Sequence, residues 1–185
     1  MPQMHIPAVR PPGTVEVKIG DEWRARFNPA TEEYGETLPA GAPVTHVWAL
    51  LYYADKGYLV RSEGETSWDM LVIEGTDIAD PAAQVARLAV ERHGLTPGKV
   101  DLIGYFSCKA TRHNTEFALG AETVRALYLV SVKQVSDVPE SSTYERRRLT
   151  LSEYGVALRS RYPHLELQMP IAAQRYAVMR ARGEA

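Results

Sequence analysis

One stretch of the chain, LVIEGTDIADPAAQVARLAVERHGL over residues 71–95, carries the residues whose types and spacing point most directly to chemistry. Arg87 and Glu91 are four positions apart, so a helix would place them on one face, where they can form an ion pair. A carboxylate such as Glu91 is also a ligand for Mg²⁺ or Mn²⁺, cations that neutralise the charge of a diphosphate during its cleavage. The pair is therefore either a solvated ion pair or part of a metal site.

Local signals predict a strand, a glycine loop and a capped helix for this stretch. Residues 71–73 are a short apolar run, and Gly75 follows in a polar break. Asp80 is a good N-cap, Pro81 suits the first helical position, and Gly94 suits the left-handed residue that ends a helix. The predicted helix has an apolar stripe of Val85, Leu88, Ala89 and, at its edge, Arg92. Because the start signal, the stop signal and the periodicity agree, we predict a helix between Asp80 and Gly94.

Hydrophobic periodicity predicts the elements that must position this stretch. Before it come an irregular arm (1–13), a hairpin (15–19 and 23–27), a connector rich in proline and glycine (28–44), a buried strand (45–54) and its returning partner (58–61). After it come strands at 100–109 and 122–133 with a polar loop between them (110–120), a strand end followed by a helix (147–161), and a last helix from Pro170 to about Arg182. The nearly unbroken apolar run from Val124 to Val132 is typical of a strand in the middle of a covered sheet. The order predicts a mixed sheet with helices on its faces.

The central stretch resembles the signature of the Nudix superfamily, G-x5-E-x7-R-E-U-x-E-E-x-G-U, where U is a bulky aliphatic residue. Arg87 takes the arginine position and Glu91 the first glutamate of the E-E pair, while Gly94-Leu95 matches the closing G-U. Gly75 is the counterpart of the opening glycine, with the loop shortened by two residues. The degenerate box covers residues 73–95, and the resemblance as a whole spans residues 45–162.

The resemblance implies a fold, an activity and an assembly. The fold would be α/β: a Nudix-like mixed β-sheet sandwiched between helices (α/β/α), with an N-terminal hairpin extension. Residues 1–44 would form an arm and hairpin, and residues 45–185 the Nudix-like domain with C-terminal helices. The activity would be Mg²⁺- or Mn²⁺-dependent hydrolysis of a nucleoside diphosphate linked to another group, with Arg87 and Glu91 as catalytic residues and Gly75 at the substrate. Because N-terminal strands build a dimer in some members, a homodimer is expected.

The departures from the signature leave more than one function open. Leu88 and Arg92 occupy positions where the family has metal-binding glutamates, and Asp77 or Asp80 is only a loose substitute for the glutamate of the loop. A single carboxylate, Glu91, is a weak ligand set for a divalent cation. The chain is therefore either a hydrolase with a degraded metal site or a catalytically inactive module that binds a nucleotide-like ligand or a protein partner. A third alternative is an enzyme of different chemistry that reuses the cleft.

The polar loop 110–120 bears on these alternatives, because it contains Arg112, His113 and Glu116. It is either a solvated loop or a wall of the cleft beside the central helix. In the second case Glu116 would join Glu91 as a metal ligand, and Arg112 and His113 would contact the substrate.

Other polar residues have mainly structural interpretations. His93 lies in the last helical turn, where a cation suits the helix dipole. We expect a solvated loop at Glu140 and Glu145, although some family members place an acidic residue there, and a solvated face at Arg146-Arg147-Arg148. We expect Trp48, Tyr52, Tyr53 and Cys108 in the core.

Composition narrows the class of protein. The formal charge of -2 over 185 residues gives no sign of a general nucleic-acid-binding or membrane-binding surface. The single Cys108 excludes an intrachain disulfide framework and a multi-cysteine zinc site. The longest apolar run, near VWALLYYA, is too short to span a membrane, and no secretion signal precedes it. We expect a cytoplasmic protein whose ligand is a small molecule.

Overall fold

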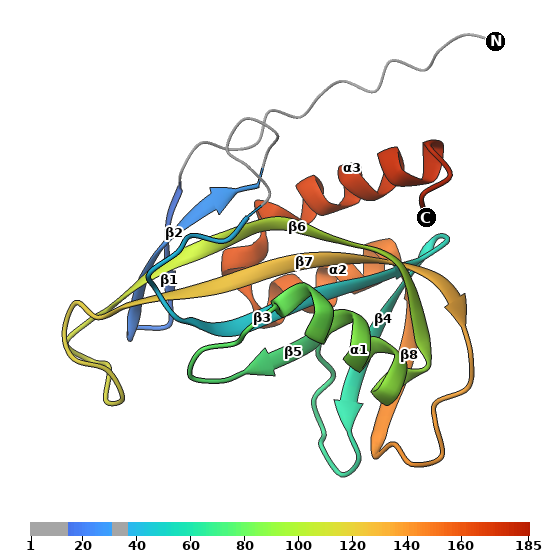
Figure 1. Cartoon of the computed structure of the whole chain (residues 1–185), viewed down its shortest axis with the longest axis horizontal. Coiled ribbons are helices and arrows are strands. Elements are labelled where there is room, and N and C mark those ends of the chain that lie inside the picture. The colour runs from blue at the N-terminus through green and yellow to red at the C-terminus, as the bar shows by residue number, and fades with distance from the viewer. Residues whose placement is uncertain (1–14, 31–36) are drawn as a thin grey trace, which may run out of the picture.

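Strand β3 (Val44–Tyr53) lies inside an eight-stranded sheet, parallel to β7 (Glu122–Val135) and antiparallel to its other partners (Figure 1). The computed structural model describes residues 15–30 and 37–185. The other elements are β1 (Val15–Ile19), β2 (Trp23–Pro29), β4 (Lys56–Ser62), β5 (Leu71–Glu74), α1 (Pro81–His93), β6 (Leu95–Ala110), β8 (Tyr144–Thr150), α2 (Leu151–Arg161), the 3-10 helix η1 (Pro163–Leu165) and α3 (Gln168–Ala181). The strand order is β1-β2-β6-β7-β3-β4-β8, and β5 pairs with β3.

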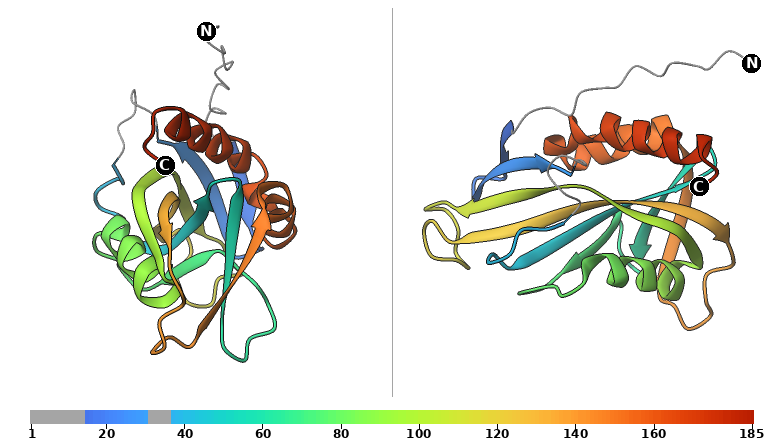
Figure 2. Two further views of the ribbon diagram at one scale, coloured as in Figure 1. Left: turned by 90° about the vertical axis from the view of Figure 1, so that its right-hand side faces the viewer. Right: turned by 45° about the horizontal axis from the view of Figure 1, so that its top comes forward.

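Helices cover both faces of the sheet, with α1 on one side and α2 and α3 on the other (Figure 2). Alternation along β3 supplies both cores, because successive side chains of a strand point to opposite faces. Val47, Ala49 and Leu51 pack with the buried stripe of α1, whereas Trp48, Leu50 and Tyr52 pack with the residues of α2 and α3. The predicted α/β/α arrangement is confirmed. No helix in the described part of the chain is both long enough and apolar enough to cross a membrane.

Helix α1 begins and ends where the capping signals predict. The Asp80 side chain accepts a 3.3 Å hydrogen bond from the Ala83 N–H, and Gly94 adopts a left-handed φ of 64°. A Cβ at position 94 would lie 2.2 Å from the carbonyl oxygen of Asp137, so only glycine fits there. The buried stripe consists of Val85, Leu88, Ala89 and His93, so His93 takes the place that the periodicity assigned to Arg92.

The N-terminal hairpin belongs to the main sheet. Strand β2 pairs with β6 from Trp23↔Ala110 to Pro29↔Gly104, which leaves β1 at the sheet edge. The hairpin that was expected as an N-terminal extension is therefore hydrogen-bonded into the sheet of the main domain. The paired part of β6, residues 104–110, lies almost wholly within the predicted strand 100–109, and the 16-residue strand begins five residues before that prediction, at Leu95. The predicted arm 1–13, and positions 31–36 of the connector, lie outside the described residues.

Candidate functional site

A cleft opens where the sheet divides. The first half of β3 pairs with β5, from His46↔Glu74 to Ala49↔Leu71, whereas its last residues, Tyr52 and Tyr53, pair with β4. An isolated β-bridge links Val60 of β4 to Asp69, two residues before β5 begins. The resulting cleft has a volume of about 490 Å³ and extends from the last turn of α1 to the end of α2. Its charged lining residues are Arg61, Arg92, Arg125, Arg161, Glu65, Asp69 and Glu74.

Two of the arginines in the cleft are neutralised by carboxylates. Arg161 Nε lies 2.9 Å from Asp69 Oδ2, which also accepts a 2.8 Å hydrogen bond from the Tyr162 hydroxyl. Burial of Asp69 raises the pKa of its carboxyl despite these contacts. Arg61 Nε lies 2.5 Å from Glu145 Oε2 across the β4–β8 pair. Glu145 is therefore a strand residue, and the prediction of a loop there is wrong.

The other two arginines of the cleft lack such a partner. Among residues 15–30 and 37–185, no carboxylate lies within ion-pair distance of Arg92 or Arg125. The Arg92 guanidinium carbon lies 4.7 Å from the ring centroid of Tyr144, a cation–π contact that leaves its N–H groups directed elsewhere. Arg125 is 8% exposed, and its Nε has no hydrogen-bond partner. The cleft thus contains two guanidinium groups without a carboxylate.

The histidines of the cleft add no charge at neutral pH. Burial, reinforced by the Arg125 charge, lowers the pKa of His46 to about 4. Burial likewise lowers the pKa of His93 to about 4, with further contributions from Arg92 and Arg146. His93 is 1% exposed and packs edge-to-face on Tyr144. The interpretation of His93 as a cation at the helix terminus is therefore wrong, because its site is too buried for the protonated ring.

Arg87 and Glu91 form the ion pair that their spacing predicts, with 2.7 Å between Nη1 and Oε2. Their side chains are 55% and 54% exposed, and neither residue lines the cleft. Leu88 lies on the buried face of α1 and is 6% exposed. In the described part of the chain, no three His, Cys, Asp or Glu side chains are grouped so as to hold a metal ion. The donor set does not fit Mg²⁺ or Mn²⁺, since Leu88 and Arg92 stand where two carboxylates would be needed.

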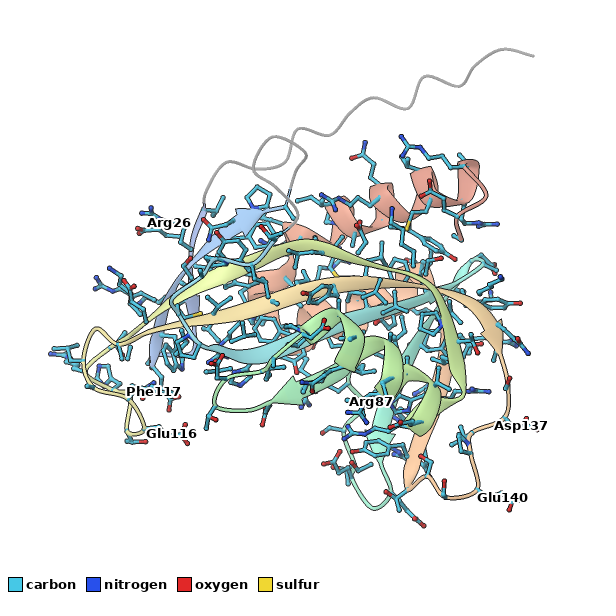
Figure 3. All side chains as sticks on the ribbon, in the orientation of Figure 1. Arg26, Arg87, Glu116, Phe117, Asp137 and Glu140 are labelled. Carbon is cyan, nitrogen blue, oxygen red and sulfur yellow. The ribbon has the colours of Figure 1, made fainter. Side chains whose placement is uncertain are left out.

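The polar loop between β6 and β7 does not reach this cleft. Strands of 16 and 14 residues carry it to the far end of the molecule, and Figure 3 shows Glu116 well away from Arg87 on α1. Arg112 and His113 line a different cavity of about 660 Å³, beside the turn between β1 and β2. The expectation that this loop faces the cleft is wrong, and Glu116 is not brought together with Glu91.

The remaining predicted residues have structural positions. Gly75 starts the exposed loop before α1, and its N–H donates a 3.0 Å hydrogen bond to the Thr45 carbonyl. Glu140 lies in the exposed loop between β7 and β8 (Figure 3). Arg146 donates a hydrogen bond to the His93 carbonyl, so it fixes the end of α1 rather than facing solvent. Cys108 is buried, as predicted, and burial raises the pKa of its thiol to about 11.

The sequence and the structure of the chain were compared with those of known proteins. No protein-family model and no curated protein sequence matches the chain. Among solved structures, a mutant form of the Bacillus subtilis pyrophosphohydrolase RppH matches at a TM-score of 0.50 and 13% identity, over 73% of this chain and 77% of that one. The NUDIX domain of Shewanella oneidensis NrtR, solved with ADP-ribose, matches at a TM-score of 0.47 and 20% identity, over 79% of this chain and 99% of that one. The match to RppH shows that the chain has the mixed α/β fold of Nudix hydrolases.

Proposed function

We propose that this chain is a Nudix-fold binding module that recognises an anionic, nucleotide-like ligand in the cleft between β4 and β5 without hydrolysing it. The observation that carries the proposal is Arg92, a cation that lines the cleft at a position where the Nudix signature has a metal-binding glutamate. A guanidinium can neutralise phosphate oxygens directly and bind two of them at once. Arg92 therefore substitutes a side-chain charge for the charge of a metal ion.

The other surfaces of the cleft suit such a ligand. Trp48, Val72 and Tyr144 supply apolar and aromatic lining, against which a planar base can pack. Glu65 and Glu74 supply carboxylate oxygens, which accept hydrogen bonds from sugar hydroxyl groups. The cleft is thus lined mainly by charged and polar side chains, with the aromatic rings of Trp48, Tyr144 and Tyr162 among them, a lining that suits an anionic ligand better than an apolar one.

Hydrolysis is the second candidate, because Glu65 and Glu74 are carboxylates in the cleft. It would require Glu91 to leave Arg87 and reach the cleft, or a metal ion held beside Arg92 against charge repulsion. In the part of the chain that the structure describes, Glu91 is paired with Arg87 and no three potential ligands are grouped for a metal ion. Binding without turnover is therefore the stronger proposal.

Calorimetric titration with ADP, ADP-ribose and inorganic pyrophosphate, first in EDTA and then in Mg²⁺, tests the proposal. We expect at least one compound to bind in EDTA, Arg92→Gln to weaken binding tenfold or more, and no phosphate release. Arg159→Gln is the matched control, since Arg159 is an exposed arginine of α2 outside the cleft lining. Mg²⁺-dependent turnover that Glu91→Gln abolishes would show instead that the chain is a hydrolase. The homodimer also stays a prediction, which light scattering at micromolar concentration would test.

A further inference from the structure

The second unpaired arginine of the cleft, Arg125, lies in an unusual place for a charge. It interrupts the apolar run of β7, opposite His46 of β3 in the strand register. Only 8% of its surface is exposed, yet it lines the same cleft as Arg92. Arginine is rarely buried to this degree without a carboxylate, because desolvating a charge is costly.

The surroundings of Arg125 stabilise its charge only in part. Its guanidinium carbon lies 5.3 Å from the ring centroid of Trp23 and 5.8 Å from that of Trp48. Burial lowers the pKa of the guanidinium, while Cys108, through its side-chain hydrogen bond, and the more distant Glu74 and Glu22 oppose that shift, and the group stays protonated at neutral pH. Such aromatic contacts satisfy the flat face of a guanidinium and leave its N–H edge available.

The titratable groups next to Arg125 in the described part of the chain are uncharged at neutral pH. Burial holds the pKa of both His46 and His164 at about 4, so both rings are neutral at neutral pH. Burial also raises the pKa of the Cys108 thiol to about 11, so the sulfur carries no charge to pair with the guanidinium. The Nε of Arg125 is buried without a hydrogen-bond partner. Among residues 15–30 and 37–185, Arg125 therefore has no carboxylate partner, and a neutral thiol as its polar neighbour, at the wall of the cleft.

We propose that Arg125 is an interior oxyanion site, and that the ligand of this cleft carries a second oxyanion, a phosphate or a carboxylate, which binds Arg125 while the first binds Arg92. This inference rests on the proposed function and adds to it the class of ligand: a small molecule with two anionic groups. Arg92 would bind the outer oxyanion of the ligand and Arg125 the inner one, because Arg92 is partly exposed and Arg125 is buried. A ligand oxyanion would supply the partner that the protein itself does not provide.

If Arg125 serves ligand binding rather than packing, replacing it should weaken binding without lowering the stability of the free chain. Arg125→Met keeps a flexible stem between the two tryptophans and removes the unpaired charge, so we expect the melting temperature without ligand to rise. The same substitution should weaken binding tenfold or more, and Arg125→Lys should weaken it about fivefold, because lysine lacks the bidentate edge. Arg159→Gln, the exposed control, should change neither quantity.

Calorimetry and thermal unfolding of these variants, with pyrophosphate and citrate as probes, test the inference. Citrate binding would identify a carboxylate ligand, and binding of pyrophosphate alone a phosphate ligand. Unchanged affinity in Arg125→Met, with a lower melting temperature, would show that Arg125 only packs between the tryptophans and would leave the proposed function intact. If Arg125→Met does not fold, unchanged affinity in Arg125→Lys overturns the inference. If neither probe nor any nucleotide binds the unmodified chain, the proposed function fails together with the inference.

Discussion

Arg87 holds Glu91 through a 2.7 Å contact on the exposed face of α1, away from the cleft that Arg92 lines. The last carboxylate of the Nudix-like signature is thus engaged with a neighbour four positions earlier on the same helix. Pairs of this kind contribute about 0.3–0.5 kcal/mol when both side chains are solvated. The surviving motif residues are therefore explained by local helix electrostatics, and the cleft must work through other groups.

Glu91→Gln should consequently leave ligand affinity unchanged, within about twofold. The free energy of unfolding should fall by about 0.5 kcal/mol or less, measured by urea titration. Arg87→Gln should give the same small change, and the double variant should cost no more than either single one, since each removes the same pair. A Mg²⁺-dependent loss of binding in Glu91→Gln would contradict this account.

Arg92→Glu restores an acidic residue of the Nudix signature, but we expect that it does not restore metal-dependent hydrolysis. We expect affinity for an anionic ligand to fall by about 10- to 100-fold, because a charge-assisted contact of about 1.5–3 kcal/mol is replaced by repulsion. Calorimetry in EDTA measures this loss. We also expect no phosphate release in Mg²⁺. Leu88 still occupies another position at which the signature has a metal-binding glutamate, and its side chain is buried. Recovery of metal-dependent hydrolysis by this single change would show that the cleft is catalytically intact.

Much of the fold follows from the sequence because its signals are local. Asp80, Pro81 and Gly94 bracket α1, and the alternation in β3 supplies a core for each face of the sheet. Capping and periodicity need only neighbouring residues, so they can be recognised without knowledge of the rest of the chain. The hairpin was predicted for the same reason, but its pairing with β6 was not, since pairing depends on a strand about eighty residues away.

The candidate site was less predictable, because it depends on contacts distant in sequence. The cleft exists because β3 changes partner from β5 to β4 along its length, which no local pattern encodes. Arg112, His113 and Glu116 were placed beside the cleft on chemical type alone, and the length of β6 and β7 carries them elsewhere. One signal for Arg125 was present: a charged residue inside the apolar run Val124–Val132. A charge in a strand buried on both faces requires an explanation.

The N-cap of α1 gives a test of the fold that is separate from ligand binding. Asp80 has a φ of 44°, a left-handed conformation that asparagine and aspartate tolerate better than other side chains. Asp80→Ala should lower the free energy of unfolding by about 2 kcal/mol, from loss of the cap and from backbone strain. Asp80→Asn keeps both properties and should cost less than about 0.5 kcal/mol. Urea titration compares the two, and equal costs would show that the cap does not stabilise α1.

The half-buried ring of His164 should make stability depend on pH. It packs against Trp48 and Phe106, its Nε2 has no hydrogen-bond partner, and burial, together with the Arg125 charge, lowers its pKa from 6.5 to about 4. Because the unfolded chain takes up a proton that the folded chain rejects, this stability is fully present above pH 6.5 and is lost as the pH falls toward 4. We expect the urea midpoint to drop between pH 7.5 and pH 5, and His164→Phe to reduce that drop while changing the midpoint at pH 7.5 little. His113→Gln, at an exposed position, should leave the drop unchanged, and an undiminished drop in His164→Phe would assign it to other groups.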